Sequence, residues 1–320
     1  IMPNYQGVWS LTTQMQNRTG WPTRFQPRGL FFGGEPSSGT VTDAIDFVDI
    51  TTTGNATDFG DLSAAKNALT SVSSFSRAVA AAGNEGGNAI NVMEYVTIAN
   101  TGNVTDFGDL TATAQESVGT GNDTRGLISL GQSNGASDTI DYITIASTGN
   151  AQDFGNLTVA RGYGQDSAVS SPTRGIFSGG YTNQAVNTID YVTIGSTGNA
   201  TDFGDLTVSR YGMGGGSSAT RGIFGGGNNS VTGNTIDYIT IASTGNAADF
   251  GDLLSSDRYI SGTSNGTRGV FGGGQDNSDS SRKNVIQYVT IASTGNATDF
   301  GDLTAARGKL TATSGSHGGI

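Results

Sequence analysis

TIDYVTIGSTGNATDFGDLTVSR, residues 188–210, decides the fold, because nearly the same segment occurs six times in the chain. The other copies begin near residues 44, 93, 139, 235 and 285. The aromatic residue of the D-F-G motif recurs every 47 to 50 residues, at Phe59, Phe107, Phe154, Phe203, Phe250 and Phe300. A period of this length is typical of β-propeller blades. Helical repeats of similar length need long segments with a 3.6-residue period, and here Gly, Ser, Thr and Asn interrupt every segment.

Each repeat predicts four short strands. The first is R-G-I-F-G-G-G at 221–227, and the second is T-I-D-Y-I-T-I-A-S at 235–243, rich in residues that favour strands. The apolar residues of the second strand fall on both faces, as expected for a sheet packed between two others. The Gly-Asn dipeptide that follows predicts a two-residue type II′ hairpin turn, with A-T-D-F-G-D-L as its second arm. A glycine-rich segment, such as 210–219, is expected to be the innermost strand, where blades crowd near the axis.

The expected fold is therefore all-β, a six-bladed propeller with four-stranded blades. The chain enters the repeat at the Gly-doublet strand 28–34 and leaves it after a small-residue strand at 308–316. The last strand is then expected to complete the first blade, which removes the open sheet edge. Residues 28–320 form the propeller in this interpretation, and residues 1–27 form an N-terminal arm. The tail from residue 316 aligns loosely with T-R-G-I and could begin a seventh blade, but six blades are preferred.

The repeat resembles kelch-type β-propellers. The matching features are an apolar strand that ends in a Gly doublet (226–227), an acid–aromatic pair in the next strand (237–238) and an Arg-Tyr-Gly stretch (210–212). The resemblance covers roughly residues 28–320, and it implies a kelch-like propeller. The sequence departs from the family in that Phe replaces the usual outer-strand Trp and two copies lack the doublet.

Composition excludes several classes of function. The formal net charge is -11, which argues against binding to nucleic acid or to an anionic membrane surface. The absence of cysteine excludes disulfides and thiol chemistry. No apolar run is long enough for a spanning helix, so membrane insertion is not expected. The first ten residues show no signal-peptide pattern.

Basic residues recur at fixed places in the repeat. One set opens the Gly-doublet strands: Arg28, Arg77, Arg125, Arg174, Arg221 and Arg268. A second set follows D-F-G-D-L: Lys66, Arg161, Arg210, Arg258 and Arg307. Because a residue needed in every blade serves the blade first, we expect the first set to be a blade-locking ring of contacts to carboxylates or carbonyls. The alternative is a ring of guanidinium groups that binds an anionic glycan or phosphate.

Catalytic and metal-binding patterns are weak. Asp299 and Asp302 of one D-F-G-D copy could hold calcium, but each copy offers only two or three oxygen ligands where calcium takes about six to eight. The preferred interpretation is turn capping by Asp, with no metal and no cofactor. His317 is the single histidine, and it lies in a Gly-rich tail that is a poor place to orient a general base. Glycan cleavage needs only two carboxylates and stays open as an alternative, but we expect no enzyme activity.

The arm carries both tryptophans of the chain, Trp9 and Trp21. They are candidate anchors that either pack against the propeller or dock it to a larger assembly. The stretch G-V-W-S-L-T-T-Q followed by W-P resembles the opening of many bacteriophage virion proteins, tail fibres in particular. The Gly-, Thr- and Asn-rich blades are similar to predicted structural proteins of marine phages. These resemblances imply a location in the virion.

The expected function is that of a non-enzymatic virion structural protein, a tail-fibre or surface-appendage subunit that mediates host-surface recognition or assembly. Its expected partners are other virion proteins, through the arm, and a host surface glycan or protein, through loops on the rigid scaffold. The loops that vary between blades are 35–41, 84–91, 132–138, 181–187, 228–234 and 275–284. The alternatives are a capsid decoration or architectural subunit, a secreted or cell-surface bacterial adhesin or glycan-binding propeller, and a glycan-cleaving enzyme.

Overall fold

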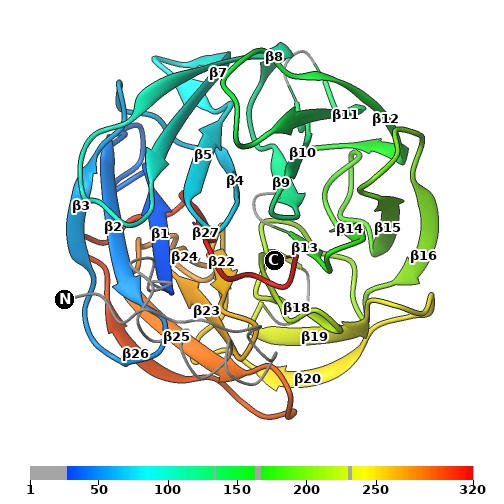
Figure 1. The fold of residues 1–320 in the computed structure, drawn as a ribbon. Coiled ribbons are helices and arrows are strands. Elements are labelled where there is room, and N and C mark those ends of the chain that lie inside the picture. The colour runs from blue at the N-terminus through cyan, green and yellow to red at the C-terminus, as the bar shows by residue number, and fades with distance from the viewer. Residues whose placement is uncertain (1–26, 133–134, 163–166, 230–232, 320) are drawn as a thin grey trace, which may run out of the picture.

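The chain is a six-bladed β-propeller in the computed structural model, which describes residues 27–132, 135–162, 167–229 and 233–319. Six antiparallel sheets stand around a central axis (Figure 1). These ranges contain no helix, and hence none long and apolar enough to cross a membrane. The predicted all-β propeller with six four-stranded blades is confirmed. Trp9 and Trp21 of the predicted arm lie outside the described residues.

The two strands nearest the axis differ in composition. The innermost strands carry mostly small side chains: β4 (Thr70–Ser73), β9 (Val118–Gly121), β13 (Ala168–Ser170), β17 (Gly214–Ser217), β22 (Ser261–Ser264) and β27 (Thr311–Ser314). The second strands each begin with arginine and then turn apolar or small: β1 (Arg28–Phe32), β5 (Arg77–Ala81), β10 (Arg125–Ser129), β14 (Arg174–Ser178), β18 (Arg221–Gly225) and β23 (Arg268–Gly272).

The two outer strands contain the repeated I-D-Y and D-F-G motifs. The third strands are β2 (Ala44–Asp49), β7 (Asn88–Thr97), β11 (Ser137–Thr144), β15 (Thr188–Thr193), β19 (Thr235–Thr240) and β25 (Val285–Thr290). The outermost strands are β3 (Thr57–Asp61), β8 (Thr105–Ala114), β12 (Gln152–Arg161), β16 (Thr201–Asp205), β20 (Ala248–Asp252) and β26 (Thr298–Asp302). Three two-residue strands lie outside this pattern: β6 (Asn84–Glu85) pairs with β7, and β21 (Asp257–Arg258) pairs with β24 (Gln275–Asp276).

The C-terminal strand closes the ring. β27 pairs antiparallel with β1, with Gly29 opposite Ser314 and Phe32 opposite Thr311. The first blade therefore has the order β27-β1-β2-β3, as the sequence predicted. Every inner strand is joined in sequence to the outer strand of the preceding blade, so the closure repeats the connection used between all blades. No blade is left with an unpaired inner edge.

The hydrophobic core is divided among the six blade interfaces. Each of six buried clusters contains residues from two adjacent blades. In the cluster that joins the last blade to the first, Phe31 and Ile50 pack with Ile286 and Phe300. The Phe of each D-F-G motif meets the aromatic residue of the neighbouring third strand edge-on, with ring centroids 5.8–6.1 Å apart. Both faces of every sheet are buried, which explains why the strands do not alternate apolar and polar residues.

The Gly-Asn dipeptide does not form the predicted two-residue hairpin turn. Seven residues, 241–247, connect β19 to β20, and Gly245 and Asn246 lie near their end. These two residues contact the outer strand of the preceding blade. The Gly245 N–H donates to the Phe203 carbonyl at 2.8 Å, and Asn246 Oδ1 accepts from the Asp205 N–H at 3.1 Å. All six copies make this pair of bonds, at 2.7–2.8 Å and 3.1 Å.

The same contact explains the glycine of D-F-G-D. Gly204 has φ +144°, and a Cβ built on it would lie 2.5 Å from the Gly245 carbonyl oxygen of the next blade. Only a residue without a side chain allows this close approach of two backbones. The repeated G-N and D-F-G motifs are therefore the two halves of one contact between blades.

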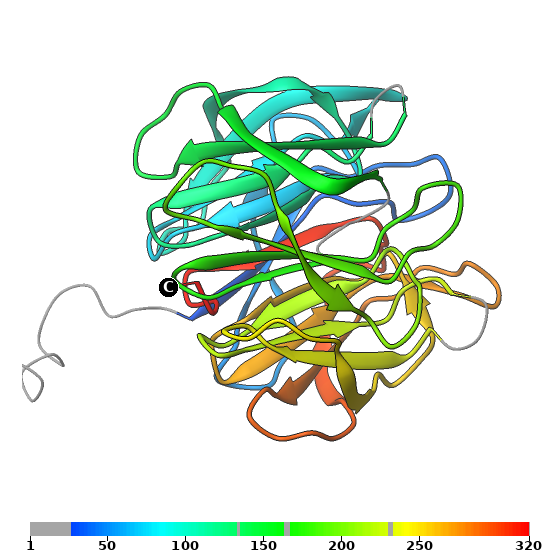
Figure 2. The same cartoon turned by 90° about the vertical axis from the view of Figure 1, so that its right-hand side faces the viewer.

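The propeller has two faces that differ in sequence. The second strands begin on one face, here called the arginine face. They end on the opposite face, here called the variable-loop face, which carries the loops that differ between blades. Figure 2 shows the C-terminal tail at the arginine face, on the left, and the longer loops on the right.

Candidate functional site

The six arginines predicted to form a ring do lie between blades. Each donates from Nη1 to the carbonyl of the Ile that follows the third strand of the next blade, at 2.8–3.1 Å. Arg268 of the last blade reaches Ile50 of the first, which completes the ring. Each guanidinium also lies over the aromatic ring of its own third strand, 4.1–4.7 Å from the ring centre. These contacts engage each guanidinium through hydrogen bonding and cation–π attraction.

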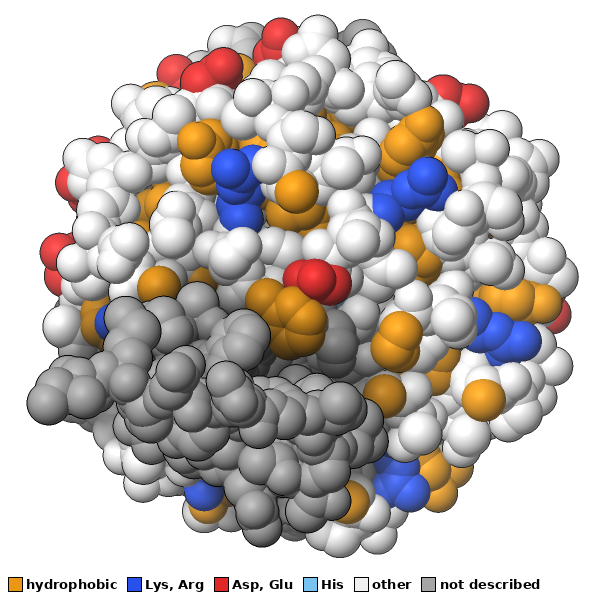
Figure 3. Space-filling model, in the orientation of Figure 1, with side chains coloured by type: hydrophobic (Ala, Val, Ile, Leu, Met, Phe, Trp, Pro, Cys, Tyr) orange, Lys and Arg blue, Asp and Glu red, His pale blue; other side chains and the backbone are white. Residues whose placement is uncertain are grey.

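Basic side chains on the arginine face stand apart from one another. Where this face is visible in Figure 3, each blue side chain lies beside orange hydrophobic groups and is separated from the next by uncharged surface. They do not merge into one basic patch. This arrangement favours a structural role of the ring over the binding of an extended anion.

Most of the second basic set forms buried ion pairs with the acid of the third strand. The pairs are Arg210–Asp237 at 2.9 Å, Arg161–Asp190 at 3.0 Å, Arg307–Asp46 at 3.1 Å and Lys66–Glu94 at 3.2 Å. Arg210 and Asp237 are fully buried, and Thr207 Oγ1 also donates to Asp237 at 2.6 Å. Burial lowers the pKa of Arg210, and the nearby Asp237 carboxylate opposes that shift. Both members of each pair are present in the sequence, but they lie far apart along the chain. The sequence alone therefore did not predict that they contact each other.

Two blades break this pattern. In the third blade Ala114 occupies the place of the basic residue, so Asp141 is buried with hydrogen bonds from Thr111 in place of a cation. Burial raises the pKa of Asp141, and the bonds from Thr111 oppose that shift. In the last blade the acid is replaced by Gln287, whose Oε1 accepts from the Leu254 N–H at 2.7 Å.

The predicted alternative of a calcium site is not supported by a ligand cluster. The acids that precede the D-F-G phenylalanine, Asp299 among them, are exposed at the rim. Within the ranges that the structure describes, no three His, Cys, Asp or Glu side chains come together in a group that could hold a metal ion.

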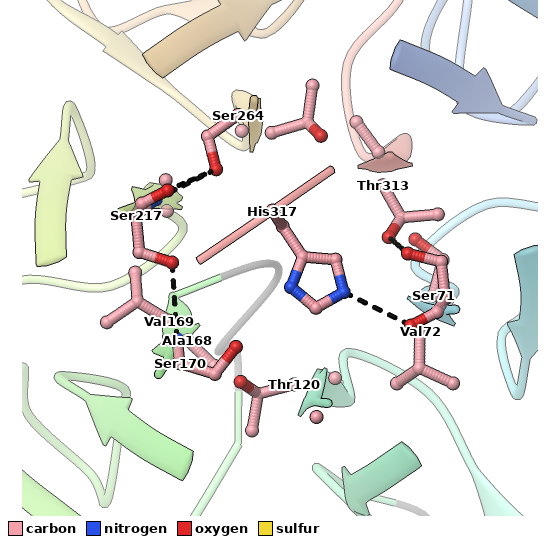
Figure 4. Close-up of a pocket in the computed structure, with 18 residues that line it drawn as sticks. Ser71, Val72, Thr120, Ala168, Val169, Ser170, Ser217, Ser264, Thr313 and His317 are labelled. Atoms are coloured by element: carbon pink, nitrogen blue, oxygen red, sulfur yellow. Dashed lines mark hydrogen bonds between the residues drawn. The ribbon is translucent and has the colours of Figure 1, made fainter. Parts of the chain in front are cut away.

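The axis contains a cavity of about 50 Å³, lined by the inner strands of all six blades (Figure 4). Its walls are hydroxyl groups, glycines and small apolar side chains. Several hydroxyls bond across neighbouring blades: Ser73 Oγ lies 2.6 Å from Thr313 Oγ1, and Ser264 Oγ donates to the Ser217 carbonyl at 2.8 Å. The cavity is polar but carries no charged side chain in its lining.

The C-terminal tail lies across this cavity on the arginine face. His317 points toward the cavity, and its Nε2 lies 3.1 Å from the Ser73 carbonyl (Figure 4). The Gly319 N–H donates to His317 Nδ1 at 3.1 Å, so Nδ1 is unprotonated and Nε2 carries the proton. Gly319 packs so closely that a Cβ there would overlap the Gly121 carbonyl oxygen. The tail therefore seals the axis and does not begin a seventh blade.

His317 is not arranged as a general base. Both ring nitrogens are engaged by backbone groups, and burial lowers the pKa of the imidazole. A catalytic serine would need to donate to one of these nitrogens. Backbone groups occupy both positions, so the axial cavity holds hydroxyls without an available base.

The variable-loop face carries a cluster that departs from the sixfold repeat. Tyr181, Tyr211 and Tyr259, here called the tyrosine row, come from three successive blades and are half-buried. The Tyr181 and Tyr211 rings are 5.3 Å apart and the Tyr211 and Tyr259 rings 6.2 Å apart, measured between centroids. Lys309 Nζ continues the row 5.4 Å from the Tyr259 ring centre, and it lies 3.4 Å from Glu35 Oε2.

Sequence reasoning missed the tyrosine row. Tyr181 follows a Gly doublet, whereas Tyr211 and Tyr259 precede inner strands at two different positions of the repeat. A search for residues that recur in every blade does not find them. The signal that could have found them is the opposite one, aromatic residues present in some copies and absent from others.

No protein-family model and no curated protein sequence matches the chain.

Proposed function

We propose that this chain is a non-enzymatic structural protein of a virus particle, a tail-fibre or surface-appendage subunit whose variable-loop face contacts the host surface. One observation carries the proposal. The ring arginines and the G-N asparagines, which recur in every blade, are used in contacts between blades, whereas the residues that differ between blades gather on one face. A rigid scaffold with one variable face suits recognition better than catalysis.

Two further observations support it. The described residues hold no metal-ligating cluster, and the one histidine has both ring nitrogens engaged by backbone groups. The carbonyl of Pro27, the last residue of the predicted arm, accepts a hydrogen bond from the Ile50 N–H at 2.9 Å, at the arginine face. An attachment through the arm would leave the variable-loop face pointing away from the assembly.

The test has two measurements. Immunogold labelling of purified particles should place the chain on the particle surface, and fluorescently labelled protein should bind host cells and compete with particle adsorption. If the antibody labels the bacterial envelope but not the particles, the proposal is wrong and the chain is a bacterial adhesin. If the particles are labelled but the protein does not bind cells, the chain is an architectural subunit.

A further inference from the structure

The tyrosine row is continuous with a set of paired charges. From Tyr181 to Tyr211, Tyr259 and Lys309, each group contacts the next at 5.3, 6.2 and 5.4 Å. Glu35 then links Lys309 to Arg282, whose Nη2 lies 2.8 Å from Glu35 Oε1. The elements that supply these residues belong to four successive blades, from the fourth blade round to the first.

Aromatic rings in this position have no structural counterpart in the other blades. The place held by Tyr259 and Lys309 is held by Ala68, Glu116 and Gly212 elsewhere, and those blades close equally well. The backbone bonds are the same: Tyr259 donates to the Gly212 carbonyl as Ala68 does to that of Lys309. An aromatic side chain at position 259 is therefore not needed to build the propeller.

Most of the charges beside the row are paired within the protein, whereas the Arg258 guanidinium, 5.7 Å from the centre of the Tyr259 ring, donates to Ser280 Oγ at 2.9 Å. Lys309 and Arg282 both contact Glu35, and Lys283 lies 2.9 Å from Asp276. A cationic ligand would lie beside these basic groups uncompensated, and an anionic ligand would have to displace Glu35 or Asp276 from them. The row instead offers aromatic surface and polar atoms, such as the Asn228 side chain that donates to the Tyr211 hydroxyl at 2.7 Å.

We propose that the tyrosine row binds an uncharged oligosaccharide, whose sugar rings pack on the tyrosines while its hydroxyls bond to the neighbouring polar side chains. Aromatic faces accept the C–H surfaces of sugar rings, and tyrosine supplies rigid contact area at low entropic cost. This inference rests on the proposed function, because it names the chemical class that the variable-loop face recognises.

The experiment uses the full chain on an array of printed oligosaccharides that includes neutral hexose and N-acetylhexosamine chains and acidic uronate and sulfated chains. We expect retention on at least one neutral chain. Tyr211→Ala and Tyr259→Ala should each weaken that binding at least tenfold, as measured by titration calorimetry with the retained oligosaccharide. Tyr211→Phe should keep most of the binding, because it preserves the ring.

The matched control is Phe75→Ala, which removes a half-exposed aromatic side chain from the arginine face and should leave binding unchanged. Melting curves establish that each variant is folded, and Ala at 259 has a precedent in Ala68, which adopts the same left-handed backbone (φ 55° against 51°). Retention on acidic chains alone or on nothing would overturn the inference, as would equal binding by the tyrosine variants. Immunogold labelling does not depend on oligosaccharide binding. If the oligosaccharide inference fails, the proposed location in a virus particle can therefore still be correct.

Discussion

The acid buried in the third strand is paired with a cation in some blades and has only hydrogen-bond donors in another. Asp237 is paired with Arg210 inside the fifth blade, whereas Asp141 occupies the same place in the third blade with hydrogen bonds from Thr111. Replacing one member of a buried ion pair leaves the other charge in a medium that solvates it poorly. Replacing a buried acid that lacks a cation removes such a charge.

We expect Asp237→Asn to lower the free energy of unfolding by about 3–5 kcal/mol, because Arg210 loses its charged partner. Asp141→Asn should be neutral or stabilising at pH 8. Because the pKa of Asp141 is raised, the stability of the unsubstituted protein falls as the pH rises from the ordinary carboxyl pKa through the raised pKa. The benefit of Asp141→Asn should therefore vanish in acid. Urea unfolding at pH 4 and pH 8 checks both variants. Equal losses for the two would show that the cation has no role.

At the scale of elements, the G-N dipeptide repeated in every blade is explained by the contacts of the segment that connects the third strand to the outermost strand. G-N was predicted to form a hairpin turn, and the prediction was wrong because its hydrogen-bonding partner is the outer strand of another blade. Local turn rules consider only neighbouring residues, so they cannot detect this contact. The strands themselves were predictable, since Ile, Tyr and Thr in I-D-Y-I-T favour strands wherever they lie.

Gly204→Ala should lower the free energy of unfolding by about 1–3 kcal/mol, since it forces a side chain against the Gly245 carbonyl in a backbone conformation that alanine rarely adopts. The matched control is Gly195→Ala, where a Cβ meets no atom within 4 Å and where four other copies already carry alanine. Thermal unfolding followed by circular dichroism measures both. A loss at position 195 as large as that at 204 would contradict the proposed contact between blades.

At the scale of the whole molecule, the number of blades was predictable because it equals the number of copies of the repeat. The closure was predictable because the first copy lacks an inner strand and the last strand of the chain has no other place in a blade. The tail was not predictable in this way. His317 lies after the last strand and has no counterpart in the repeat, so only its contacts with Ser73 and Gly319 reveal that it seals the axis. The tyrosine row was missed for the same reason, because its members do not recur.

Removing β27 should prevent a stable monomer. A chain that ends at residue 307 leaves β1 unpaired at the axis, and we expect aggregation or a loss of cooperative unfolding in size-exclusion chromatography and calorimetry. A chain that ends at Gly315 keeps β27 and loses only the seal, and it should remain a folded monomer. If both truncations behave alike, closure by the C-terminal strand is not what holds the ring together.

The seal should loosen in acid. Because burial lowers the pKa of His317, the neutral imidazole is favoured in the docked tail, and docking is complete above the ordinary value of 6.5 and weakens as the pH falls below it. Protonation of Nδ1 also removes the bond from Gly319. The only histidine gives a single imidazole signal in NMR, whose midpoint should lie below 6.5, and amide exchange at 316–319 should accelerate over the same range. In His317→Gln that exchange should not depend on pH beyond its intrinsic rate, and a midpoint at or above 6.5 would contradict the assignment.

The pairing of β27 with β1 has a consequence for biosynthesis. β27 is synthesised about 280 residues after its partner β1, which at 5–20 residues per second is a delay of roughly 15–60 s. Until β27 is made, the first blade has at most three strands and an exposed backbone edge that other nascent chains could join. The first blade is therefore the last to be completed, and the yield of this protein in a cell depends on how well that edge is protected until β27 pairs with β1.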